Sequence, residues 1–163
     1  MKTLLVLRHA KSSWDDSGLK DHDRPLNPRG VHDAPRMGKL IVSEDLVPEA
    51  IISSTAARAL ATAELAAGVM PDAPEIETTR DLYMASPHTY LDVIADYGHG
   101  TNRLMVVGHN PGITALVTRL TGRLEEMPTA ALAVIELDIE DWDEIQGVKR
   151  GRLVGFWRPK EID

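Results

Sequence analysis

The chain has 163 residues, enough for one domain with a sizeable buried core, and its 43% hydrophobic and 26% charged residues are ordinary for a soluble globular protein. The net charge of −7 gives no global attraction to nucleic acid or to an anionic membrane, and the absence of cysteine excludes thiol catalysis, disulfides and thiolate metal sites. No apolar run approaches the roughly 20 residues that span a bilayer, so we expect a single cytoplasmic domain over residues 1–163 with no nucleic-acid or membrane partner.

Apolar, β-branched runs alternate along the chain with helical patterns. The expected strands are residues 3–7, 50–53, 76–79, 103–108, 131–137 and 152–157. The expected helices run from Pro28 to about Val42, from the cap candidates Ser53, Ser54 and Thr55 to about Ala67, from Pro87 to about Tyr97, and from Pro111 to about Thr121.

This alternation predicts βαβ units and therefore an α/β fold. We expect a three-layer sandwich, with a mainly parallel central sheet and helices on both faces. The acidic stretch between the last two strands is too short for a crossover helix, so these strands should form an antiparallel pair at one edge.

The residues that follow three of the expected strands are the informative ones. The first strand ends in Arg8 and His9, the second is followed by a helix whose first turn carries Arg58, and the strand at 103–108 is followed by His109. Because the carboxyl ends of parallel strands share one edge of a sheet, these side chains and two helix N-termini should gather in one crevice. Helix N-termini favour anions, and the guanidinium fork matches phosphate oxygens. The pattern predicts a site for an anion with phosphate geometry.

Taken singly, each residue also has a plain structural explanation. A strand must end in something polar, Arg58 could be a solvated helix residue, and His109 could bond local backbone in a turn. The combination after three strand ends favours the functional interpretation.

Three segments carry a family resemblance: LRHA at 7–10, SSTAAR at 53–58 and VVGHNPG at 106–112. They resemble the signature segments of the histidine phosphatase superfamily, in its phosphoglycerate mutase-like branch. The short length, together with LRHAKSSW, DRPLNPRG and GHNPG, is most similar to the SixA-type phosphohistidine phosphatases. The resemblance extends from Leu4 to about Trp157. Ala10 stands where many relatives have glycine, although alanine is common there in the SixA-like subgroup.

This resemblance implies that His9 is the nucleophile and carries the phosphoryl group as a covalent phosphohistidine. Arg8 and Arg58 would bind the phosphoryl oxygens, and His109 would complete the pocket. The chemistry agrees, because neutral imidazole is a nucleophile near pH 7 and surrounding cations stabilise the transferring group. Since the arginines supply the positive charge, we expect no metal and no cofactor, and we expect a phosphate or sulfate ion to bind in the pocket.

Two further candidates are less defined. Many members of the superfamily protonate the leaving oxygen with a carboxylate that follows the second motif, and Asp81 is the first candidate here, with a surface role as the alternative. Asn27 is a helix cap by its context, with substrate binding as a second possible role because relatives place a polar residue of this segment near the pocket. The other histidines, among them His22, are expected to be solvated.

The expected substrate follows from the short chain. Only about fifty residues separate the second and third motifs, which leaves little material for a lid over a small molecule. We therefore expect an open pocket and a phosphorylated protein as substrate, with phosphohistidine favoured by the resemblance. The alternatives are a phosphatase of small phosphate esters or sugar phosphates and, outside enzymes, a phosphate-binding module.

Overall fold

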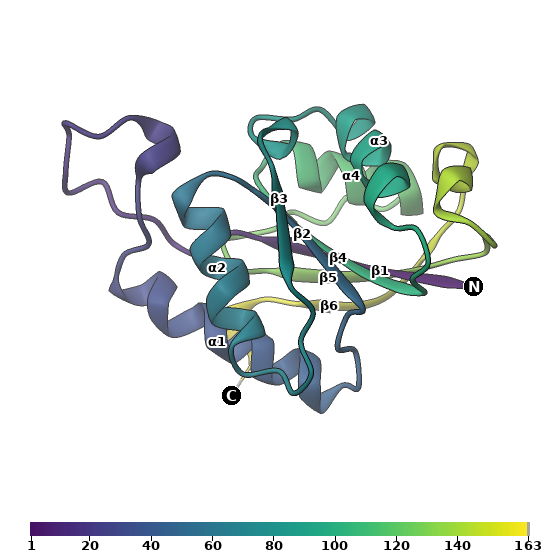
Figure 1. The fold of residues 1–163 in the computed structure, drawn as a ribbon, viewed down its shortest axis with the longest axis horizontal. Helices are drawn as coiled ribbons and strands as arrows, with labels where there is room; N and C mark the ends of the chain where they lie inside the picture. Colours follow the sequence, from purple (N-terminus) through teal and green to yellow (C-terminus); the bar gives the residue numbers. More distant parts are fainter. Residues whose placement is uncertain (163) are drawn as a thin grey trace.

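The computed structural model describes residues 1–162, and its centre is one six-stranded sheet (Figure 1). The strands are β1 (Lys2–Arg8), β2 (Ala50–Ser54), β3 (Ile76–Thr79), β4 (Arg103–Gly108), β5 (Leu132–Leu137) and β6 (Arg152–Trp157). They lie in the order β3-β2-β4-β1-β5-β6. The first four strands of this order are parallel to one another, and β5 is antiparallel to both β1 and β6. The mainly parallel sheet and the antiparallel pair at one edge are thereby confirmed.

Helices cover both faces of the sheet, as Figure 1 shows. They are α1 (Pro28–Ser43), α2 (Ala57–Ala67), α3 (Pro87–Tyr97) and α4 (Gly112–Thr121). Leu5 and Leu7 of β1 pack into a core with α1 and α2, whereas Leu4 and Val6 pack into a second core with α3 and α4. Because successive side chains of a strand point to opposite faces, a continuous apolar run is what a strand between two helical layers requires. The expected three-layer sandwich is confirmed.

The helix starts agree with the sequence in two cases. Asn27 caps α1 by accepting a hydrogen bond from the Gly30 N–H (2.9 Å), and Ser86 caps α3 by accepting one from the Thr89 N–H (3.3 Å). In α4 the helix begins at Gly112, and the Asn110 side chain accepts from the Thr114 N–H (3.1 Å).

The expected cap of α2 is wrong. This helix begins at Ala57, and its N-cap position is Ala56, which provides no side-chain cap. Ser54 stays in β2, where its hydroxyl accepts from the Ala56 N–H (3.2 Å) and faces the end of β4. No helix within residues 1–162 is long and apolar enough to cross a membrane.

Candidate active site

The carboxyl ends of β1, β2 and β4 lie level with one another. Arg8 is paired with Gly108 across β1 and β4, and Ser53 is paired with Val107 across β2 and β4. His9 and His109 therefore leave the sheet at the same point, and their ring centroids are 5.1 Å apart. The expected convergence of strand ends is observed, because parallel pairing in this register brings residues about 100 positions apart to one edge.

The two arginines join this pair from different directions. Burial, and then the nearby charge of Arg58, lower the pKa of Arg8 from its usual value. The charges of Arg8 and Arg58 also lower the pKa of His9. Arg8 continues β1, and Arg58 comes from the first turn of α2, so the four predicted side chains occupy one cluster.

The hydrogen bonding of His9 defines its tautomer. Its Nδ1 lies 2.7 Å from the carbonyl oxygen of Ala10, and because a carbonyl can only accept, Nδ1 must carry the proton. The lone pair is therefore on Nε2. Burial, followed by the charges of His109, Arg8 and Arg58, lowers the pKa of His9 to about 3. His9 is thus a neutral imidazole at physiological pH, with a free lone pair on Nε2.

His109 is held by the end of β2. Its Nε2 is 2.8 Å from the Ser54 hydroxyl, and burial together with the charge of Arg58 lowers its pKa to about 4. The Nδ1 of His109 and the Nε of Arg8 are buried and have no hydrogen-bond partner among residues 1–162. Such groups typically cost about 1–3 kcal/mol each, so both atoms are candidates for contact with a bound ligand. Arg103 Nε, at the opposite end of β4, is likewise without a partner among the described residues.

Arg58 is oriented by Asp21, which lies in the short 3-10 helix η1 (Asp21–Asp23). Arg58 donates to the backbone oxygen of Asp21 (2.7 Å) and to its carboxylate (3.0 Å). The same carboxylate accepts from the Tyr83 hydroxyl (2.5 Å) and from Arg24 (2.8 Å). These bonds, that of Tyr83 first, hold the pKa of Asp21 far below its usual range. Asp21 is ionised at neutral pH and fixes one edge of Arg58, which leaves other guanidinium N–H donors for a substrate.

Tyr83 and His22 form a wall beside His109. The Tyr83 ring stands edge-on to His109 (5.6 Å between centroids) and to His22 (4.9 Å). His22 Nε2 also lies 2.8 Å from the Thr55 hydroxyl, and the side chain is only 22% exposed. The expectation that His22 is solvated is therefore wrong.

Asp81 and Asn27 do not join the cluster by any hydrogen bond among the described residues. Asp81 lies exposed in the 3-10 helix η2 (Arg80–Leu82), where its backbone N–H donates to Thr79 (3.2 Å). Its role as proton donor stays a prediction. Asn27 caps α1, and its backbone N–H donates to the Lys11 carbonyl (2.9 Å). Its contact with substrate also stays a prediction.

Sequence reasoning missed Asp21, Tyr83 and Ser54. Ser54 was assigned to a helix cap, and nothing local distinguishes Asp21 from the neighbouring carboxylates of its polar loop. Tyr83 could have been found, because β3 is parallel to β2 and its carboxyl end reaches the same edge of the sheet. Tyr83 thus follows a fourth parallel strand end, as His9, Arg58 and His109 follow the other three.

The assembled site combines a neutral imidazole with a cluster of cationic side chains. The neutral imidazole lies among two guanidinium groups and a second imidazole. This arrangement suits the transfer of a group with anionic oxygens to a ring nitrogen, because the cations can bind those oxygens. No group of three or more His, Asp or Glu residues within residues 1–162 is arranged to hold a metal ion.

Comparison with known proteins agrees with this geometry. The family model of the histidine phosphatase superfamily (branch 1) matches residues 4–83. An uncharacterized protein of Mycobacterium tuberculosis is 35% identical over 165 residues, which cover 94% of this chain and all of that protein. A structure assigned as the phosphohistidine phosphatase SixA of Agrobacterium tumefaciens is 30% identical, with a TM-score of 0.83 over 97% of this chain and 98% of that one. The chain belongs to the histidine phosphatase superfamily.

Within this superfamily the chain is SixA-like and has the phosphoglycerate mutase-like fold. A protein histidine phosphatase SixA complexed with tungstate has the same fold, with a TM-score of 0.77 at 21% identity over 97% of each chain. These likenesses make the protein a hydrolase, a phosphatase of this superfamily.

Proposed function

We propose that this protein removes the phosphoryl group from phosphohistidine on another protein, without a metal ion, through a phosphohistidine intermediate on His9. Arg8, Arg58 and His109 bind the phosphoryl oxygens and stabilise their charge. A metal is not needed for this, because the two guanidinium groups already supply fixed positive charge where the phosphoryl group would lie.

The reaction proceeds in two steps. The Nε2 lone pair of His9 attacks phosphorus, the P–N bond of the substrate breaks, and the leaving imidazole keeps the bonding electron pair. Water then attacks the phosphorus on His9, and cleavage of the new P–N bond releases inorganic phosphate and restores His9. Two easier displacements replace one difficult displacement.

The observation that carries the choice of substrate is the set of hydrogen bonds around Asp21. The carboxylate held against Arg58 is Asp21, and its hydrogen bonds keep it ionised, so it has no proton to give. The same contact raises the pKa of Tyr83, which therefore retains its proton. A leaving imidazole takes its proton on the distal ring nitrogen from solvent, whereas an alkoxide needs an acid beside the breaking bond. Neither Asp21 nor Tyr83 is suited to be that acid, and Asp81, the remaining candidate, is exposed and makes no side-chain hydrogen bond among residues 1–162. This arrangement favours a P–N substrate over an alkyl ester.

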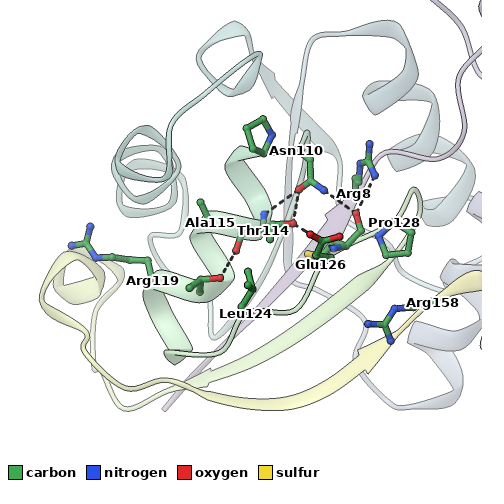
Figure 2. A pocket seen from close by; sticks show the side chains of 12 residues that line it. Arg8, Asn110, Thr114, Ala115, Arg119, Leu124, Glu126, Pro128 and Arg158 are labelled. Carbon is green, nitrogen blue, oxygen red and sulfur yellow. Dashed lines mark hydrogen bonds between the residues drawn. The ribbon is translucent and has the colours of Figure 1, made fainter.

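The open surroundings support a protein rather than a small molecule. The chain between Arg58 and His109 is used for α2, β3, η2, α3 and β4, and forms no separate lid domain. A groove of about 900 Å³ opens beside Arg8 along α4 (Figure 2). Its lining includes the exposed side chains of Leu124 and Arg119, an apolar group and a guanidinium, and arginine is enriched where protein surfaces meet.

The test compares substrates at equal concentration. A protein phosphorylated on histidine should be hydrolysed with a kcat/KM well above that of alkyl phosphates and sugar phosphates. Faster turnover of a sugar phosphate would assign the enzyme to small esters. Binding of phosphate with no turnover of any substrate would leave only a phosphate-binding module.

A further inference from the structure

A second, strongly basic cavity adjoins the catalytic cluster. It has a volume of about 390 Å³, and its lining contains five cationic side chains and one carboxylate. These residues are Arg8, Lys11, Arg29, Arg158, Lys160 and Glu161. In a chain with a net charge of −7, such a local excess of positive charge is opposite to the overall balance.

Separate parts of the chain build this cavity. Lys11 follows the nucleophile by two residues, Arg29 lies in the first turn of α1, and Lys160 belongs to the 3-10 helix η4 (Pro159–Glu161). The N-terminal end of α1 adds the positive end of a helix dipole. Like charges gathered in one cavity repel one another, so the arrangement favours occupation by an anion.

Carboxylates of the chain neutralise this charge only in part. Arg29 has its ion pair with Asp33 at 3.5 Å, and Arg158 lies 3.2 Å from Glu161 and 3.6 Å from Glu125. Within residues 1–162, Lys11 and Lys160 have no carboxylate oxygen within 4.0 Å. Two ammonium groups therefore remain available to an external anion.

The cavity shares a wall with the groove along α4. Arg8, Pro128 and Arg158 line both hollows, and Figure 2 shows Pro128 between the two arginines. Because Arg8 lines the basic cavity and also acts on His9, an anion held by Lys11 and Lys160 would lie beside the catalytic cluster. Two connected hollows on the surface suit an extended ligand better than a small ester.

We propose that this basic cavity is a subsite for the carboxylate side chains of aspartate or glutamate residues that flank the phosphohistidine of the substrate protein. The inference rests on the proposed function and adds a sequence preference to it. Lys11 and Lys160 supply the free charges, whereas Arg29 and Arg158 are paired with carboxylates of the chain. Exposed charge pairs are typically worth roughly 1.5- to 5-fold each in an equilibrium constant.

Two synthetic phosphohistidine peptides test the subsite, one with aspartate and glutamate around the phosphohistidine and one with asparagine and glutamine in their places. The acidic peptide should have a kcat/KM about tenfold higher, as expected for two or three such pairs, mainly through a lower KM. The double variant Lys11→Gln/Lys160→Gln should lose most of this preference. The charge-matched double variant Lys39→Gln/Lys149→Gln, at exposed positions outside the cavity, should keep it.

The outcomes separate the two proposals. Equal rates on both peptides, or an equal loss of preference in both double variants, would overturn the subsite and leave the proposed function standing. Failure to hydrolyse either peptide would overturn both. Equal rates on the peptides with a preference for a small ester that carries a second phosphate would assign the cavity to a small substrate and also overturn the proposal.

Discussion

Lowering the pH from 7 to 5 should leave His9 uncharged in the free enzyme. With a pKa of about 3, set by burial and by the neighbouring positive charges, only about 1% of His9 would be protonated at pH 5, against about 97% for a histidine with the ordinary pKa of about 6.5. The nucleophile should therefore remain competent two pH units below neutrality.

Nuclear magnetic resonance of the histidine-labelled protein measures this directly. The His9 signal, assigned by its loss in a His9→Asn variant, should not titrate between pH 7 and pH 5, and the signals of the other histidines serve only to check that the fold is unchanged. The rate of phosphoenzyme formation from an aryl phosphate, corrected for ionisation of the substrate, should likewise not change between pH 7 and pH 5. A His9 pKa near 6.5 would refute the reasoning that burial and Arg8 and Arg58 keep the imidazole neutral.

Three further predictions concern single groups of the site. Arg58→Ala should lower kcat by roughly 10²–10³, the usual effect of removing one preorganised donor, with the circular dichroism spectrum unchanged; a loss below tenfold would contradict its role. Asp81→Asn should hardly slow hydrolysis of phosphohistidine or of an aryl ester, but should slow an alkyl ester by roughly 10²–10⁴ if Asp81 is the acid; equal large losses on all three substrates would place it in binding or folding instead. Because the pKa values of His9 and His109 are lowered on folding, the unfolded state binds more protons below pH 6.5, and each histidine should reduce the free energy of unfolding by about 2 kcal/mol between pH 7 and pH 5. Urea denaturation at the two pH values checks this, and a His109→Gln variant should lose less stability than the wild type.

Much of the fold could be predicted because its determinants are local. The run at Leu4–Leu7 is apolar without interruption, which indicates a strand covered on both faces, and it is fully buried. Asn27 and Ser86, each followed by proline, mark helix starts that the structure confirms. The parallel order of the strands then follows from the alternation of strands and helices.

The rest of the site depends on contacts that no local pattern encodes. Asp21 reaches Arg58 across 37 positions and Tyr83 across 62, and a polar loop with several carboxylates does not reveal which one turns inward. Its neighbours in the sequence make Ser54 an ordinary helix-cap candidate. In the folded chain, however, its hydroxyl is hydrogen-bonded to His109, which is 55 positions away. The four cluster residues could be predicted from the sequence because each lies at a strand end or in the first turn of a helix.

The central claim is that His9 carries the phosphoryl group. Mixing the enzyme with a histidine-phosphorylated protein, quenching in alkali, in which phosphohistidine is stable, and mapping the modification by mass spectrometry tests it most directly. The account predicts one phosphoryl group on His9 at early times, its loss as phosphate is released, and no label in a folded His9→Ala variant. Label on another residue, or turnover that survives in the His9→Ala variant, would contradict it.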